Sequence, residues 1–207
     1  FMRPMTLDLQ WGREAFSIAI ALQNLVWGAA QPFSGWLADR FGAGRVVIGG
    51  GLVYALGLVL MAHSTQPSDF TLSAGILVGL GLSGTTFSVV YGAVARAVSE
   101  SRRAMALAIV GAAGSFGQFV LVPAVQSLIE QTGWLQTLLV LAIASAMIAP
   151  LAAGAAERNR PAGSLVQPQT TREALREAFT QRSFWLLTLG FFVCGFQVVF
   201  IGTHLPA

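Results

Sequence analysis

Long stretches without charge constrain this chain more than any other feature of its sequence. Six intervals of 23 to 26 residues contain no Asp, Glu, Lys or Arg: 15–38, 46–68, 70–95, 104–129, 131–156 and 183–207. A helix needs roughly 20 apolar residues to cross a bilayer, whereas a barrel strand needs ~10 with alternating polarity. Because backbone polar groups must be satisfied inside lipid, runs of this length predict helices. We therefore expect an all-α membrane protein with six transmembrane helices.

The composition supports a membrane protein. Only 10% of the 207 residues are charged and 55% are apolar, whereas about a quarter of the residues in a soluble domain are charged. A soluble fold would have to bury nearly the whole chain. The net charge is +3, but the twelve arginines are not clustered with aromatic residues, so nucleic-acid binding is not expected. No cluster of metal ligands and no phosphate-binding loop is present, so no metal or other cofactor is predicted.

Arginine distribution predicts the orientation in the membrane. Ten arginines fall on loops at one face: Arg40, Arg45, Arg96, Arg102, Arg103, Arg158, Arg160, Arg172, Arg176 and Arg182. The positive-inside rule places this face in the cytoplasm and residues 1–14 outside. Segments 64–69 and 130–134 are then short outer turns, and 99–103 is a short inner loop. A chain that starts outside without a signal peptide pattern is expected to follow an upstream span, so we interpret the sequence as a fragment.

Residues 157–182 differ from the other connections in length and composition. A linker rich in Pro, Gly and Ser is followed by the segment 170–179, which begins with capping threonines and carries Leu175 and Phe179 four residues apart. This spacing predicts an amphipathic helix on the inner membrane surface. The alternative is a linker without regular structure.

A short charged stretch separates the first two charge-free intervals. It contains Gly35, Asp39, Arg40, Gly42, Gly44 and Arg45. The charges end the apolar runs because charge is costly at membrane depth. Gly35 leaves room for a neighbouring helix, and Gly42 and Gly44 permit a tight turn. We therefore expect residues 35–47 to form a short loop between two antiparallel membrane helices.

This loop resembles the G-x-x-x-D-R-x-G-(x)-x-R signature between spans 2 and 3 of the major facilitator superfamily. The run 102–118, the pair Gly133-Trp134 and the start of the last interval, Ser183-Phe184-Trp185, are similar to the monocarboxylate-transporter-like and oxalate–formate antiporter-like branch. The resemblance covers nearly the whole chain. It implies the superfamily fold, with these residues forming spans 2–7.

The resemblance also implies a domain organisation. Residues 1–156 would form the N-terminal bundle, lacking most of span 1 and holding spans 2–6. Residues 157–182 would form the cytoplasmic loop between bundles, and residues 183–207 the first span of the C-terminal bundle. The matching acid in the family contacts nearby arginines and holds the outward-open state. A conformational-switch motif is therefore expected at Gly35, Asp39, Arg40, Gly42, Arg45 and Arg96.

The function implied is secondary active transport by alternating access, and not an enzyme activity. The substrate would be a small organic anion, moved by proton coupling or exchange, and the alternative within the class is efflux of drugs or other hydrophobic compounds. The expected partners are this substrate, protons if they are coupled, the lipid bilayer and the remainder of the same chain. The expected location is a bacterial inner (plasma) membrane.

Polar residues inside spans are functional candidates by default. The substrate-cavity candidates are Gln23, Asn24, Tyr91, Gln118 and Gln197. For each of them, a hydrogen bond between helices is the alternative. Thr85 and Thr86 count for less because threonine can bond to its own helix. All five candidates are neutral, so a bound carboxylate would need a cation from outside these residues.

Small residues mark expected packing faces. Gly75, Gly79 and Ser83 lie on one face of the third interval, which allows close helix approach. In the fourth interval, Gly111, Gly114 and Gly117 together with Pro123 predict a helix that bends and slides against a partner. The segment Gly81-Leu82-Ser83-Gly84 also matches the G-x-S-G of rhomboid-type intramembrane proteases. That alternative, like a non-transporting sensor, belongs to a different functional class.

Overall fold

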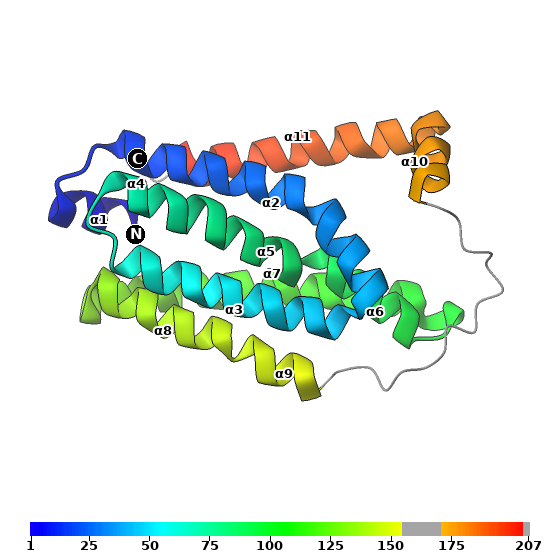
Figure 1. The fold of residues 1–207 in the computed structure, drawn as a ribbon, viewed down its shortest axis with the longest axis horizontal. Helices are drawn as coiled ribbons and strands as arrows, with labels where there is room; N and C mark the ends of the chain where they lie inside the picture. Colours follow the sequence, from blue (N-terminus) through cyan, green and yellow to red (C-terminus); the bar gives the residue numbers. More distant parts are fainter. Residues whose placement is uncertain (155–170, 205–207) are drawn as a thin grey trace. The chain divides into compact units, whose positions relative to one another are not determined.

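The computed structural model describes residues 1–154 and 171–204, and all regular structure in these ranges is helical (Figure 1). The chain divides into two compact units, Phe1–Asn159 and Arg160–Ala207. The all-α fold expected from the charge-free runs is confirmed.

The first unit is a bundle of helices connected by very short turns. Its elements are α1 (Met2–Leu9), α2 (Arg13–Phe41), α3 (Ala43–Ala62), α4 (Pro67–Phe70), the π-helix η1 (Thr71–Leu77), α5 (Val78–Thr85), α6 (Phe87–Ala97), α7 (Glu100–Thr132), α8 (Trp134–Ala146) and α9 (Ile148–Gly154). The second unit contains α10 (Thr171–Thr180) and α11 (Arg182–His204).

Four helical stretches among the described residues are long and apolar enough to cross a membrane: Ala43–Ala62, Pro67–Ala97, Glu100–Thr132 and Trp134–Gly154. They correspond to four of the six expected spans. α2 covers the interval 15–38 but carries the amides Gln23, Asn24 and Gln31, which lower its hydropathy. Membrane crossing by α2 and α11 stays a prediction from their charge-free runs.

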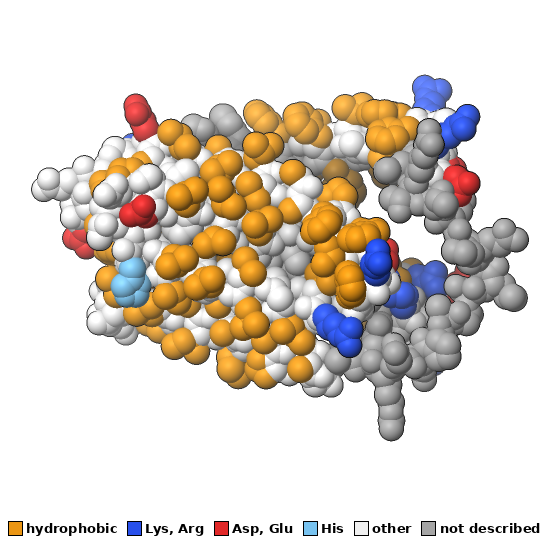
Figure 2. Space-filling model, in the orientation of Figure 1, with side chains coloured by type: hydrophobic (Ala, Val, Ile, Leu, Met, Phe, Trp, Pro, Cys, Tyr) orange, Lys and Arg blue, Asp and Glu red, His pale blue; other side chains and the backbone are white. Residues whose placement is uncertain are grey.

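Charged side chains gather at the ends of this bundle (Figure 2). In Figure 2, apolar side chains cover the sides of α2, α3 and α8, and basic side chains lie at the end where α2 meets α3. Acidic side chains lie at the opposite end. This distribution is what a membrane imposes, because charge is tolerated at the two interfaces and is costly between them.

The turns are tighter than the sequence predicted. Only Gly42 separates α2 from α3, and only Gly133 separates α7 from α8. Both have positive φ, +92° and +83°, which glycine adopts without the penalty that a Cβ imposes. The expected loop 35–47 is therefore wrong in extent, because Asp39, Arg40 and Arg45 lie on helices. Likewise, the expected outer turn 64–69 ends early, since α4 begins at Pro67.

Glycine brings α3 and α5 into backbone contact at the centre of the bundle. A Cβ on Gly81 would lie 2.6 Å from the Tyr54 Cα and N atoms, and one on Gly84 would lie 3.1 Å from the Gly50 Cα. On the α3 side, a Cβ on Gly57 would meet Val78 at 2.9 Å. Such contacts require small residues, as in other membrane helix interfaces.

The small-residue face of the third interval packs against α2, which confirms the expected close approach. A Cβ on Gly75 would lie 2.9 Å from Leu22, and one on Gly79 would lie 2.9 Å from the Gln23 carbonyl oxygen. Further along, the Ser83 and Ser34 hydroxyls are hydrogen-bonded at 2.8 Å. α5 is therefore held between α2 and α3.

The third expected span is not one continuous helix. After α4 it continues as the π-helix η1, and it is interrupted at Thr86, whose φ of −95° and ψ of −177° are extended. The Thr86 carbonyl then accepts hydrogen bonds from the backbone N–H groups of Val89 and Val90 at the start of α6. Sequence periodicity did not predict this break, because Thr86 lies within an unbroken charge-free run.

Candidate functional site

An ion pair joins α2 to α6 at the basic end of the bundle. Arg96 Nη1 donates to Asp39 Oδ1 at 2.9 Å, and both residues lie in the last turn of their helices. The side chains are 44% and 72% exposed for Arg96 and Asp39, respectively. A pair this exposed contributes at most about 1 kcal/mol to stability. Its geometry therefore suits a contact that can be broken and remade.

A small apolar cluster beneath this pair holds the three helices together. Ala38 of α2, Ala43 of α3 and Val89 of α6 are buried against one another, and Val46, Val47 and Ala93 pack around them. The short side chains of Ala38 and Ala43 permit close approach on both sides of the Gly42 turn. The ion pair therefore rests on a packed base formed by all three helices.

The other residues of the expected switch motif have different surroundings. The Arg40 guanidinium lies 5.5 Å from the Trp36 ring centroid and 5.6 Å from that of Phe41, within the range of cation–π contacts. Arg45 is exposed in the first turn of α3. A Cβ on Gly35 would meet nothing within 4 Å among the described residues, so a close helix approach at Gly35 stays a prediction. Gly44 lies inside α3, and the turn depends on Gly42 alone.

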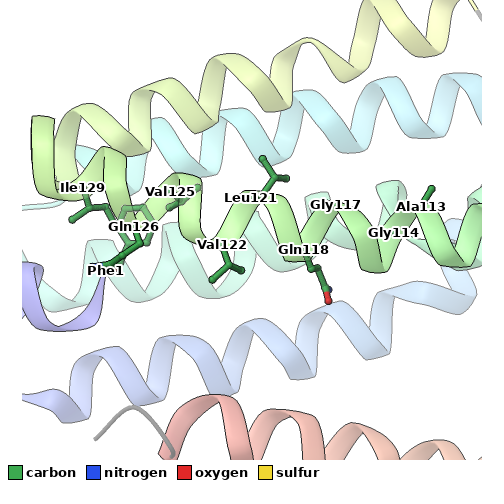
Figure 3. Close-up of a pocket in the computed structure, with 10 residues that line it drawn as sticks. All are labelled: Phe1, Ala113, Gly114, Gly117, Gln118, Leu121, Val122, Val125, Gln126 and Ile129. Carbon is green, nitrogen blue, oxygen red and sulfur yellow. The ribbon is translucent and has the colours of Figure 1, made fainter.

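A pocket of about 460 Å³ lies along α7 and contains Gln118 (Figure 3). The residues that line it are Phe1, Ala113, Gly114, Gly117, Gln118, Leu121, Val122, Val125, Gln126 and Ile129. Nine of these ten belong to α7, and Figure 3 shows Phe1 at one end of the pocket. The lining is apolar except for the amides of Gln118 and Gln126. The absence of a side chain at Gly117, where a Cβ would meet nothing within 4 Å, leaves space for the pocket.

Tyr91 lies against the same helix. Its hydroxyl would be 2.8 Å from a Cβ on Gly111, and its ring centroid is 5.1 Å from that of Phe87. Phe87 in turn occupies the space beside Gly114, where a Cβ would lie 3.0 Å from its ring. Gly111 and Gln118 are seven residues apart, which is two helical turns, so they share one face of α7. The structure therefore places the Tyr91 hydroxyl of α6 against the same stripe of the α7 surface that carries Gln118.

Within the first unit, neither Gln23 nor Asn24 is gathered with these two residues. The Asn24 side-chain amide donates to the Ile20 carbonyl of its own helix at 2.9 Å, a bond within α2 and not the bond between helices that was the expected alternative. Gln23 is half-buried, and its backbone packs on Gly79. Gln197 is exposed on α11, in the second unit.

The residues predicted to let the fourth interval bend, Gly111, Gly114, Gly117 and Pro123, differ in what they contact. Gly111 and Gly114 make the contacts with α6 described above, whereas a Cβ on Gly117 would meet nothing within 4 Å. Pro123 lies inside the continuous helix α7, whose residues are all exposed or half-buried. Bending at these positions stays a prediction.

Two side-chain hydrogen bonds join different helices through residues whose pairing the sequence did not predict. Trp27 Nε1 of α2 donates to Thr86 Oγ1 at 3.2 Å, at the break between α5 and α6. Both threonines were expected to bond to a carbonyl of their own helix. Thr85 does so at the Gly81 carbonyl, whereas the Thr86 hydroxyl accepts the bond from Trp27. Trp134 Nε1 of α8 donates to Asp8 Oδ2 at 2.7 Å, joining α8 to α1.

The serine of the protease-like segment makes helix-packing contacts. Ser83 is buried, and its hydroxyl donates to the Leu80 carbonyl at 2.7 Å, so the 2.8 Å contact with Ser34 is donated by Ser34. His63 is exposed at the end of α3, where its ring is bonded to the Val59 carbonyl. The side chain of the other histidine, His204, lies outside the described residues. The surroundings of Ser83 therefore fit packing between α2 and α5.

The sequence profile described as Major Facilitator Superfamily matches residues 1–207, the whole chain. A relative in Bacillus subtilis (strain 168), described as "Uncharacterized MFS-type transporter YcxA", is 25% identical over 99% of this chain and 51% of its own length. Human "Monocarboxylate transporter 11" is 30% identical over 84% of this chain and 36% of its own length. "Monocarboxylate transporter 12" of Xenopus laevis is 34% identical over 53% of this chain and 24% of its own length. The chain thus spans about half the length of the first relative and about a third of the second.

Proposed function

Because the chain belongs to the Major Facilitator Superfamily, we propose that it forms part of a secondary transporter for small organic anions of the monocarboxylate type. Transport would proceed by alternating access, in which two helix bundles rock around a site near the bilayer midplane. The names of two relatives support the substrate class. Proton coupling or exchange completes the proposal, since an anion moved alone would be driven only by its own concentration gradient and the membrane potential, with no second gradient to energise its accumulation.

The observation that carries this proposal is the pocket on α7 with Gln118 in it. An amide donates to a carboxylate but does not neutralise it, and burying an uncompensated carboxylate costs far more than one hydrogen bond returns. We therefore assign Gln118 an orienting role, with the Tyr91 hydroxyl against the same stripe. The compensating positive charge is assigned to parts of the transporter outside residues 1–207.

A second candidate function is efflux of hydrophobic compounds. The lining of the pocket favours it, because eight of the ten lining residues have no polar side chain and none is charged. An apolar solute needs no buried cation, and a flat aromatic one would find Phe1 at the end of the pocket.

The test is uptake by proteoliposomes that contain the full-length transporter. With a labelled monocarboxylate, Gln118→Ala is expected to raise the apparent KM about tenfold, which corresponds to ~1.5 kcal/mol for one hydrogen bond to a charged group. Tyr91→Phe is expected to act in the same direction. Gln131→Ala is the matched control, because it removes an amide from the same helix outside the pocket. Unchanged kinetics for Gln118→Ala would move the site away from α7.

The same assay separates the two candidate functions. Saturable monocarboxylate uptake that a proton gradient or a trans anion stimulates supports the anion carrier. Transport of a hydrophobic dye with no monocarboxylate uptake supports the second candidate. We also propose that the Asp39–Arg96 pair lies on the cytoplasmic side and stabilises one of the two transport conformations.

A further inference from the structure

The corner between α10 and α11 holds a cluster of exposed aromatic side chains. Phe179 at the end of α10 and Phe184 and Trp185 at the start of α11 are 53%, 36% and 49% exposed. Their ring centroids are 5.6 to 5.9 Å apart, in tilted and edge-to-face arrangements that aromatic pairs prefer. We call these three residues the corner cluster.

Hydrogen bonds fix the direction in which α10 leaves α11. Gln181 alone separates the two helices, and its backbone N–H donates to the Ala178 carbonyl at 3.1 Å. The Phe184 N–H donates to the Gln181 carbonyl at 3.1 Å, and Trp185 Nε1 reaches back to the Phe179 carbonyl at 3.0 Å. Figure 1 shows α10 turned across the axis of α11.

The charge-free run 183–207 predicts that α11 crosses the bilayer. A helix of 23 residues is ~35 Å long, enough for a hydrocarbon core of ~30 Å. A helix turned across it at its charged end then lies in the plane of the membrane surface. Trp and other aromatic residues are favoured at this depth, where one part of the ring is in apolar surroundings and another part meets water.

One side of α10 is polar and the other is apolar, as a helix in the plane of the membrane surface requires. Glu173, Arg176, Glu177 and Thr180 follow the spacing i, i+3, i+4, i+7 and are exposed on one face. Ala178 and Phe179 lie away from this face. The helix holds two arginines and two glutamates, so its formal charge is zero and it has little attraction for anionic headgroups. Its contact with lipid must therefore depend on the apolar side.

We propose that α10 is an interfacial helix that the corner cluster anchors in the membrane surface, with the phospholipid bilayer as its partner. The contact is made by the aromatic rings at the level of the headgroups and the first acyl carbons. It sets the depth of the first turn of α11, including Arg182. The proposal concerns lipid contact alone and does not depend on the transport activity proposed above.

The test measures depth along α10 in the full chain, reconstituted in phosphatidylcholine bilayers. Single cysteines at Ala178 and Glu177, in a Cys194→Ser background, carry a spin label whose collisions with oxygen and with a water-soluble nickel chelate are compared. Oxygen concentrates in lipid, so the label at position 178 is expected to collide several-fold more with oxygen than with nickel. The label at position 177 is expected to show the opposite ratio.

Two variants relate this pattern to the corner cluster. Phe179→Ala is expected to lower the oxygen-to-nickel ratio at position 178 several-fold. Phe191→Ala removes an equally large ring from α11, 78% exposed and two turns beyond the corner, and is expected to leave the ratio unchanged. Adding phosphatidylserine is expected to change neither ratio, because α10 is neutral.

Three results would overturn the proposal. Equal accessibility at positions 177 and 178 would show a helix in water, and protection of both from oxygen and nickel would show cover by protein. A pattern that exists only with phosphatidylserine would show attraction to charged headgroups in place of aromatic anchoring.

Discussion

Gly81 offers the sharpest test of the packing at the centre of the first unit. In Gly81→Ala, the new Cβ would lie 2.6 Å from the Tyr54 Cα and N atoms and 2.7 Å from its Cβ. Carbon atoms that are not bonded pack at about 3.5–4.0 Å, so α3 and α5 would have to separate by roughly 1 Å. The obstructing atoms belong to a helix backbone and its Cβ, so a rotamer change gives no relief.

The expected cost follows from this separation. A gap of up to 1 Å forfeits about a quarter to a half of each dispersion contact along the interface. Overpacking of this kind typically costs 1–3 kcal/mol, and we expect ~3 kcal/mol because backbone atoms are involved. The equilibrium constant for unfolding then rises by about two orders of magnitude, since 1.4 kcal/mol corresponds to a factor of ten.

The assay is reversible unfolding of the purified chain in mixed micelles, followed by circular dichroism. Gly117→Ala is the matched control, because it adds the same methyl group to a helix where nothing lies within 4 Å. It is expected to be neutral or to stabilise the chain by up to ~1 kcal/mol through helix propensity. Equal stability of the two variants would refute the reasoning, because it would mean that α3 and α5 are not in backbone contact at Gly81.

Two further predictions concern contacts between α2 and α6. Asp39→Asn is expected to reduce transport strongly in the full-length protein. It is expected to lower the free energy of unfolding by less than about 1 kcal/mol, because the pair with Arg96 is exposed. Wild-type flux at equal expression would remove Asp39 from the mechanism. Thr86→Val is expected to destabilise by ~1–3 kcal/mol, because it leaves the Trp27 N–H without its acceptor. In the Trp27→Phe background, the same change is expected to cost less, and an equal cost in both backgrounds would show that the bond contributes nothing.

The sequence by itself determined the class of the fold and the positions of most helices. Charge-free runs of this length leave only helices, because no water is present inside a bilayer to satisfy an open backbone. The stretch around Asp39 and Arg40 also carried enough information to predict the family, since its glycines and charges perform a local task at a helix end. The pairing of Asp39 with Arg96 was within reach for the same reason, because both lie at the charged end of their runs.

Only the tertiary structure decided which small and polar residues meet. Gly35 and Gly81 look alike in the sequence, yet one faces open space and the other touches the Tyr54 backbone, because the rotation of each helix about its axis depends on all of its neighbours. The same holds for the polar groups: Asn24 turns to its own helix, whereas Thr86 accepts a bond from Trp27 59 residues away. The break at Thr86 also needed the fold, because its Oγ1 acceptor has its partner on α2 and no local pattern encodes that contact.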